Sequence, residues 1–293
     1  PEDFGVGVVK AIEQALKKYK IQSNDVSLLA HATTVVTNAI LEEKGAKVGL
    51  ISTLGFRDIL ELRRSARADL YDLFQDPPSV LVQRRNRFEI TERIDAEGQV
   101  VIPIIEDEIE QLISKLKTAQ VEAVAVSLLF SFLNDKHEAL VGRRLREALP
   151  NIPVFLSSEV LPEIREFERT STTAICAYVG PILSSYLARL KNSVTEKGLP
   201  TPYVMGSGGG LFEIEESLMM PAMAAESGPA AGVIAAALGG NQINRANLLS
   251  FDMGGTTAKA SLIKNGVIET TPEYEVGGEG SGSRWLHGTG HPI

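Results

Sequence analysis

Cysteine is almost absent from the sequence: Cys176 is the only one among 293 residues. A single cysteine excludes an internal disulfide framework and is typical of a protein that works in the reducing cytoplasm. No apolar run approaches the roughly 18 residues that a transmembrane helix requires, and no charged-then-apolar leader opens the chain. We therefore expect a cytoplasmic protein without a membrane partner.

Clusters of basic residues are also missing. Lysine and arginine number 29 against 37 aspartates and glutamates, which gives a net charge of −8. Nucleic-acid binding draws much of its affinity from basic side chains at phosphates, so no nucleic-acid partner is expected. Hydrophobic residues make up 44% and charged residues 23% of the chain, an ordinary globular composition, and the length allows two domains.

The most informative stretch runs from residue 247 to 265. Residues 248–251 form a short apolar run that predicts a buried strand, and a second run lies around residues 260–263. Asn265-Gly266 closes the second run with a turn dipeptide. The pattern predicts a strand, a tight glycine loop at 252–257 and a returning strand.

The residues of this loop suit a phosphate group. Gly254 and Gly255 have no Cβ, so backbone N–H groups can approach an anion closely, and Thr256 and Thr257 add hydroxyl donors. Asp252, at the carboxyl end of the strand, could hold Mg²⁺ or orient a water molecule. An ordinary Gly-Gly hairpin turn explains the same spacing, so the stretch alone leaves both interpretations open.

A helix rich in small residues is predicted just before the loop, over residues 226–238. Ser227 suits its cap and Pro229 its first turn. Because alanine and glycine dominate this segment, the helix backbone can pack very close to a neighbour, as an interdomain hinge requires.

A small-residue helix followed by strand-Asp-x-Gly-Gly-Thr-strand resembles the second phosphate motif of the actin, hexokinase and heat-shock chaperone ATPase superfamily. Within that superfamily the chain most resembles the hydantoinase/oxoprolinase family, of the N-methylhydantoinase A type, which is the ATP-dependent subunit. The resemblance extends over nearly the whole chain and is carried, besides the glycine loop, by residues 31–45, 55–62, 69–74, 161–171, 207–210 and 227–232.

The resemblance implies an α/β protein with the actin-like ATPase (ribonuclease H-like) fold, in which helices flank mixed sheets. It implies the N-terminal region of the family at residues 1–168 and the start of the hydantoinase A domain, with the second phosphate loop, at residues 169–293. The family's first phosphate loop and its adenosine-contacting segment have no counterpart here. The resemblance therefore predicts a fragment, incomplete at both ends and inactive by itself.

The implied function is hydrolysis of a cyclic amide, such as a hydantoin, N-methylhydantoin or 5-oxoproline-like ring, coupled to cleavage of ATP with Mg²⁺. The alternatives are a subunit of an ATP-dependent ketone carboxylase, a small-molecule kinase of the same superfamily, and a non-catalytic nucleotide-binding module. The resemblance also implies a partner, either a second hydantoinase B-type subunit or a fused domain.

Asp252 is predicted as a catalytic and metal-binding residue and His31 as a second catalytic residue. His31 is predicted at a strand end beside exposed hydroxyls of Thr33, Thr34 and Thr37. Two alternatives remain open: His31 as a hydrogen-bonded structural histidine, and the threonines, with Asn38, as caps of the helix that follows. The residues predicted to contact the nucleotide phosphates are Gly254, Gly255, Thr256, Thr257, Lys259, Gly208 and Gly209.

Lys259 is the point at which the chain departs from many relatives, which have an acidic residue after the threonines. Its ammonium group could reach a phosphate oxygen or point into solvent. Gly208 and Gly209 lie in a glycine-rich loop after a predicted strand at 203–205, where a plain turn is the alternative. His287 and His291 are four residues apart, but the surrounding glycines and proline argue against the helix that would make them a metal site.

The remaining segments alternate between strand and helix patterns, which predicts a mixed sheet flanked by helices. A hairpin is expected over 85–94 and 99–102. Helices are expected at 4–20, 34–43, 105–116, 135–149 and 167–197, and strands at 26–32, 47–53, 123–130 and 154–157.

Overall fold

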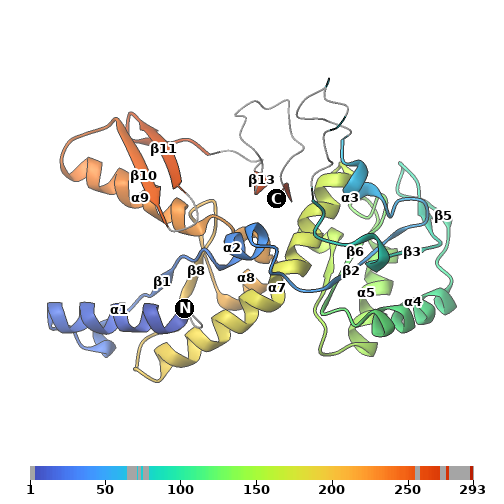
Figure 1. Cartoon of the computed structure of the whole chain (residues 1–293), viewed down its shortest axis with the longest axis horizontal. Coiled ribbons are helices and arrows are strands. Elements are labelled where there is room, and N and C mark those ends of the chain that lie inside the picture. Colours follow the sequence, from blue (N-terminus) through green and yellow to red (C-terminus); the bar gives the residue numbers. More distant parts are fainter. Residues whose placement is uncertain are drawn as a thin grey trace. The chain divides into compact units, whose positions relative to one another are not determined.

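A computed structural model of the chain describes residues 4–64, 71, 74, 79–254, 258–270, 275–276 and 291–292. The chain divides into two compact units (Figure 1): unit 1 comprises residues 1–38 and 182–271, and unit 2 comprises residues 39–181 and 272–293. Two of the three divisions fall within helices α2 (Val35–Leu41) and α7 (Glu166–Thr195), and the third follows residue 271. Each unit therefore consists of two stretches that are separate in the sequence. The division into family regions at 1–168 and 169–293 stays a prediction.

Unit 2 is built on a four-stranded parallel sheet with the strand order β3-β2-β6-β7. Every residue of β2 (Val48–Thr53) and β6 (Ala123–Ser127) is buried, as expected for parallel strands covered on both faces. β3 (Arg87–Ile90) and β7 (Val154–Leu156) form its edges. Consecutive strands in the sequence are not always neighbours in this order, so the chain reverses its direction of winding between β2 and β6.

Helices α4 (Glu106–Ala119) and α5 (Lys136–Ala148) supply much of the core of unit 2. The buried side chains of α4 recur at helical spacing and pack with those of the central strands. They are Ile109, Leu112, Ile113 and Leu116. The predicted helices over 105–116 and 135–149 are confirmed.

The predicted hairpin over 85–102 is only partly correct. The hairpin itself consists of β4 (Arg93–Ile94) and β5 (Val100–Ile102), with an irregular register at Arg93 and Ile94. Residues 87–90 form β3 instead, which follows the turn η2 (Arg84–Asn86) and pairs in parallel with β2. Alternation of apolar and polar residues does not distinguish a local antiparallel partner from a distant parallel one.

Unit 1 contains helix α1 (Phe4–Tyr19), the turn η1 (Ser23–Asp25) and a small sheet with the order β1-β8-β9. β1 (Ala30–His31) is parallel to β8 (Tyr203–Met205), which pairs antiparallel with β9 (Leu211–Phe212). The predicted strand over 26–32 is therefore only two residues long. Helix α8 (Ile214–Met219) and the turn η3 (Pro221–Ala224) follow β9.

A second sheet of unit 1, with the order β10-β11-β12, packs against helix α9 (Ser227–Gln242) (Figure 1). It comprises β10 (Leu248–Met253), β11 (Ala258–Lys264) and β12 (Val267–Ile268). Asn265 and Gly266 both have positive φ, 54° and 75°, which suits the predicted tight turn between β11 and β12. This antiparallel sheet carries the predicted phosphate loop.

The short elements of unit 2 are α3 (Ile59–Leu62), α6 (Ser157–Val160), β13 (Glu275–Val276) and β14 (His291–Pro292). His291 thus lies in a strand, and His287 lies outside the described residues. In the described part of the chain, no helix combines the length and the hydropathy that crossing a membrane requires.

A buried carboxylate fastens the carboxyl ends of β6 and β7. Glu138, on α5, is fully buried and accepts hydrogen bonds from the backbone N–H groups of Leu128 and Ser158, at 2.7 and 2.8 Å. The Ser157 hydroxyl donates a third bond, at 2.6 Å. Because the cost of burying a carboxylate is offset by such bonds, Glu138 belongs to the scaffold of unit 2.

Arg169, on α7, is the cationic counterpart of Glu138. It donates to the Ser131 hydroxyl and to the Leu128 carbonyl, both at 2.7 Å, and the Ser131 and Ser157 hydroxyls lie 3.1 Å apart. The guanidinium only donates and the carboxylate only accepts, so the two serines relay hydrogen bonds from Arg169 to Glu138. Burial lowers the pKa of Arg169, and the charges of Glu138 and Glu166 oppose that shift.

We predict that Glu138→Ala lowers the free energy of unfolding by about 3 kcal/mol, because it leaves two buried N–H groups without an acceptor. Urea denaturation followed by circular dichroism measures the change. Glu147→Ala is the control, since Glu147 lies exposed on the same helix, and a change within about 0.5 kcal/mol is expected for it. Equal stabilities for the two variants would contradict a structural role for Glu138.

Candidate functional site

The glycine loop joins two strands of a hairpin, as the sequence predicts. The prediction that the first strand is buried is wrong, because Leu249 and Phe251 of β10 are exposed. β10 and β11 pair antiparallel from Leu248 opposite Ile263 to Met253 opposite Ala258. Asp252 lies opposite Lys259 in this register, and Gly254 continues the chain beyond β10. The predicted phosphate contacts Gly255, Thr256 and Thr257 lie outside the described residues.

The Asp252 side chain is exposed near the end of β10 and makes no hydrogen bond or ion pair with any residue that the structure describes. Its neighbours on the strand, Phe251 and Met253, are 63% and 70% exposed. The carboxylate is therefore accessible to a ligand. The described residues contain no group of three or more histidine, cysteine, aspartate or glutamate side chains that could hold a metal ion.

Lys259 takes neither of the two positions that the sequence suggested. Its ammonium group pairs with the Glu226 carboxylate, and only 23% of the Lys259 side chain is exposed. Burial lowers the pKa of the Lys259 amine. The adjacent carboxylate favours its charged form, so we interpret the contact as an ion pair.

Glu226 immediately precedes α9 and adopts a left-handed conformation with a φ of 59°. Its backbone N–H donates to the Thr37 hydroxyl, at 3.0 Å, while its carboxylate holds Lys259. One residue thus connects β11 to the segment that follows β1. Sequence reasoning did not assign a role to Glu226, and a non-glycine residue with positive φ gives no sequence signal of its own.

Ser227 fastens the first turn of α9 to the same segment. Ser227 is fully buried. Its hydroxyl accepts a hydrogen bond from the N–H of Thr33 at 3.0 Å and donates one to the Thr33 carbonyl at 2.9 Å. Ser227 is therefore the first residue of the helix rather than its predicted cap, while Pro229 lies in the first turn as predicted. The start of α9, the segment after β1 and the hairpin strand β11 together form the candidate site.

The hydroxyls near His31 are not all exposed, contrary to the expectation. Thr33 and Thr37 are only 6% and 3% exposed, and Thr34 alone faces solvent. The Thr33 hydroxyl accepts the N–H of Val35, the first residue of α2, at 3.2 Å. This is the helix-capping alternative for Thr33, and the buried Thr33 and Thr37 side chains support the segment after β1.

Two glycines allow the close approach that the small-residue helix predicts. A Cβ at Gly228 would lie 3.2 Å from the Thr34 methyl group, and one at Gly240 would lie 2.3 Å from a Leu248 methyl group and 2.7 Å from the Arg245 carbonyl. Gly232, by contrast, has open space around it. The close contacts thus occur at the two ends of α9, toward the segment after β1 and toward β10.

His31 ends β1, and its Nε2 lies 2.7 Å from the Tyr186 hydroxyl. Burial lowers the pKa of His31 below its ordinary value of 6.5. This hydrogen bond corresponds to the structural alternative for His31, and the catalytic role stays a prediction.

Gly208 and Gly209 lie in the turn between β8 and β9, a hairpin rather than a strand-to-helix turn. Gly209 has a φ of 84° and donates its N–H to the Gly206 carbonyl, at 3.0 Å. A Cβ at Gly209 would lie 2.8 Å from the Ile234 side chain of α9, whereas Gly208 faces open space. The turn therefore contacts α9, and a ligand-binding role for either glycine stays a prediction.

Solved structures identify the class of fold. The crystal structure of the ATP-dependent caprolactamase from Pseudomonas jessenii matches with a TM-score of 0.79 at 33% identity, over 89% of this chain and 39% of that one. The nucleotide-free structure of acetone carboxylase matches with a TM-score of 0.79 at 28% identity, over 91% of this chain and 40% of that one. The chain is an α/β protein of the actin-like ATPase type.

The chain belongs to the hydantoinase/oxoprolinase family. The model of the hydantoinase/oxoprolinase N-terminal region matches residues 1–149, and the hydantoinase/oxoprolinase model matches residues 169–287. This confirms the family resemblance carried by the motifs.

Among proteins, an uncharacterized protein of Methanocaldococcus jannaschii is 42% identical over 100% of this chain and 43% of its own length. Caprolactamase subunit alpha of Pseudomonas jessenii is 36% identical over 83% of this chain and 35% of its own length. The chain thus spans less than half the length of either relative.

We predict that NMR titration of His31 gives a pKa below 6.5, because burial disfavours the imidazolium form. Between the two pKa values, His31 is protonated in the unfolded chain and neutral in the folded chain. The free energy of unfolding therefore decreases as the pH falls from about 6.5 toward the lower folded-state pKa. His31→Gln assigns the signal and should flatten this part of the stability profile. A measured pKa above 6.5 would show that a charged partner, and not burial, dominates at His31.

Proposed function

We propose that the chain holds the nucleotide phosphates in an enzyme that hydrolyses a cyclic amide at the expense of ATP. The observation that carries the proposal is the exposed Asp252 carboxylate, placed near the end of β10 just before the glycine loop and without a partner among the described residues. The similar structure from P. jessenii is that of an ATP-dependent caprolactamase, and caprolactam is a cyclic amide.

Asp252 is proposed to hold Mg²⁺ or to orient the attacking water. A magnesium ion bound to nucleotide phosphates keeps several waters and takes only one or two protein carboxylates, so a single aspartate suits it. Backbone N–H groups of Gly254 and Gly255 and the hydroxyls of Thr256 and Thr257 are proposed to restrain the phosphate oxygens. Such donors act without reorganisation when charge develops in the transition state.

Lys259 and Glu226 are proposed as positioning residues. Their ion pair connects β11, directly opposite Asp252, to the residue that precedes α9. Since the Lys259 charge is already paired, Lys259 is proposed to hold β11 at the start of α9 rather than to bind phosphate. His31 is proposed to support the segment after β1 through Tyr186.

The proposed chemistry divides a difficult hydrolysis into easier steps. The amide oxygen attacks the γ-phosphorus of ATP and ADP leaves, which makes the amide carbon electrophilic. A first water then adds to that carbon and the ring nitrogen departs as the amine, which leaves an acyl phosphate. A second water hydrolyses the acyl phosphate to the carboxylate and free phosphate. The balance is one lactam, one ATP and two waters converted to one amino acid, ADP and phosphate.

We predict that Asp252→Asn lowers ATP turnover of the full-length enzyme by about 100-fold or more, since it removes the carboxylate charge while keeping the shape of the side chain. Circular dichroism should show an unchanged fold, because Asp252 is exposed. Glu269→Gln, an exposed acid of unit 1 beyond β12, is the matched control and should turn over ATP normally. Turnover by Asp252→Asn at the wild-type rate would remove Asp252 from the site.

A ketone carboxylase is the second candidate, because acetone carboxylase gives the same TM-score of 0.79 as caprolactamase. The identity to caprolactamase is higher, 33% against 28%, which favours the hydrolase.

The two reactions differ in their co-substrate. We predict that the full-length enzyme, with its partner subunit, opens a cyclic amide and releases ADP and phosphate without added hydrogencarbonate. Chromatography of the products measures this. A requirement for hydrogencarbonate and consumption of a ketone would establish the carboxylase instead, and a phosphorylated product that persists would establish a kinase.

A second subunit or a fused domain is proposed to complete the enzyme. The relative from P. jessenii is named as the alpha subunit of caprolactamase, and this chain spans 35% of it. The product assay therefore uses the full-length polypeptide with and without its partner, and amide hydrolysis should require both.

A further inference from the structure

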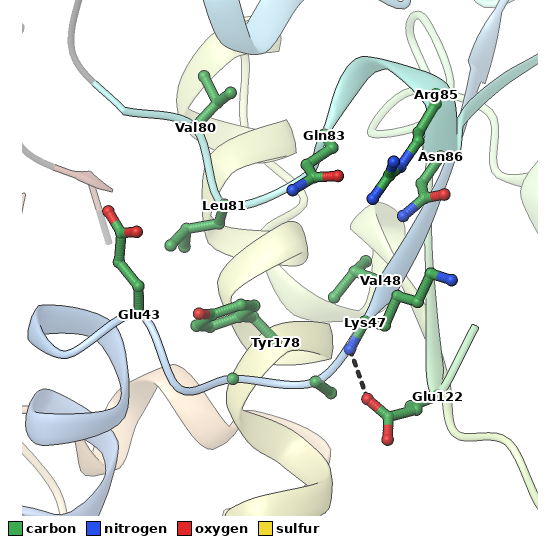
Figure 2. Close-up of a pocket in the computed structure, with 12 residues that line it drawn as sticks. Glu43, Lys47, Val48, Val80, Leu81, Gln83, Arg85, Asn86, Glu122 and Tyr178 are labelled. Carbon is green, nitrogen blue, oxygen red and sulfur yellow. Dashed lines mark hydrogen bonds between the residues drawn. The ribbon is translucent and has the colours of Figure 1, made fainter. Parts of the chain in front are cut away.

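A cavity of about 310 Å³ opens in unit 2, far along the sequence from the glycine loop (Figure 2). It lies at the amino ends of three strands of the parallel sheet: Val48 begins β2, Asn86 directly precedes β3 and Glu122 directly precedes β6. Its size is at the lower end of the range for small-molecule sites. All of its lining residues belong to unit 2.

The floor of this cavity is a close contact between Gly45 and the ring of Tyr178. A Cβ at Gly45 would lie 2.0 Å from a ring carbon, so only glycine permits the contact. Beside it, the N–H of Ala46 donates to the Tyr178 carbonyl at 2.8 Å, and the N–H of Lys47 donates to the Glu122 carboxylate at 2.7 Å. These bonds hold the segment in place, and they occupy Glu122.

Several polar side chains that line the cavity have no protein partner. Asn86 is only 6% exposed, yet its amide makes no hydrogen bond to any residue that the structure describes. Within the same described ranges, the side chains of Lys47, Gln83, Arg85 and Glu43 make no ion pair or hydrogen bond. The amide atoms of Asn86 are not enclosed, because the only buried side-chain atoms without a hydrogen bond in the described residues are the Nε atoms of Arg63 and Arg169. Asn86 therefore presents a free amide to the cavity that it lines.

The charges of these side chains are separated across the cavity. In Figure 2, the cationic side chains of Arg85 and Lys47 lie on the same side as the amides of Gln83 and Asn86. Glu43 lies on the other side, near the Tyr178 hydroxyl, and Leu81 lies between the two sides. Burial raises the pKa of Tyr178, so its hydroxyl remains a hydrogen-bond donor at neutral pH.

We propose that this cavity binds a small amino dicarboxylate, such as an acidic amino acid. Two carboxylates would meet the two free cations, Arg85 and Lys47, with the amides of Gln83 and Asn86 as further donors, and the ammonium group would meet Glu43. Arginine can bind a carboxylate through two parallel hydrogen bonds, which fixes its orientation. A ligand without the amine leaves Glu43 facing only negative charge, and a ligand with one carboxylate leaves one cation unpaired.

The test is direct binding to the purified protein at constant ionic strength, by calorimetry or ligand-detected NMR. The probe is L-glutamate, compared with glutarate, which lacks the amine, and with 4-aminobutyrate, which lacks one carboxylate. Because the charges are exposed, each lost group should weaken binding by only about threefold to tenfold. Glutamate should therefore bind most tightly, with a dissociation constant in the millimolar range.

Each of two variants should remove a different part of the preference for glutamate. Arg85→Gln should remove the advantage of glutamate over 4-aminobutyrate, and Glu43→Gln should remove its advantage over glutarate. Glu42→Gln is the matched control, because Glu42 is adjacent in sequence, pairs with Lys44 and does not line the cavity. It should bind all three probes as the wild type does.

The proposal is overturned if the wild type binds none of the probes at 20 mM, or if neither variant changes the order of the three affinities. Equal affinity for glutarate and glutamate would reduce the cavity to a general anion site and would also overturn it. This inference goes beyond the proposed function and is separable from it. Asp252→Asn should leave glutamate binding unchanged, so either proposal can fail while the other stands.

Discussion

The candidate site depends on the buried hydroxyl of Ser227, which bonds to both the N–H and the carbonyl of Thr33. A serine at this position satisfies two backbone groups of a segment about 190 residues away in the sequence, and therefore fixes where α9 begins. Glu226 extends the connection by binding the Thr37 hydroxyl and the Lys259 side chain. These contacts connect β11, which follows the predicted phosphate loop in the sequence, to the start of α9 and to the segment after β1.

Two buried charged side chains of unit 2, Glu138 and Arg169, bond to other parts of the protein, whereas other charged groups remain accessible. Glu138 and the two terminal nitrogens of Arg169 form hydrogen bonds at the carboxyl ends of the unit 2 strands, while the Arg169 Nε is buried without a partner among the described residues. This is the edge where open parallel sheets usually bind ligands. Buried polar side chains occupy most of the described part of that edge, and a cavity of only about 10 Å³ remains beside Arg169. Asp252 in unit 1 and the groups around Asn86 in unit 2 remain available instead, which is why both proposals rest on them.

Predictions from sequence succeeded where the signal is local. The hairpin β10–β11 and its neighbouring turn follow from short apolar runs and from Asn265-Gly266, whose positive φ values need those residue types. Amphipathic spacing likewise predicted α4. Prediction from sequence failed for the pairing of β3, because its partner β2 lies more than thirty residues earlier. It also failed for the position of Lys259, because its partner Glu226 is more than thirty residues away. Neither pairing leaves a pattern in the local sequence.

The sequence by itself therefore determined the family, the α/β class and the hairpin that carries Asp252, because motifs and hydrophobic periodicity are properties of neighbouring residues. Only the tertiary structure decided that Thr33 and Thr37 are buried supports, that Lys259 is paired, and that Asn86 faces a cavity without a partner. The physical reason is that burial and charge pairing depend on which distant segments come into contact. The sequence names a hydroxyl or an ammonium group but does not show which distant groups will surround it.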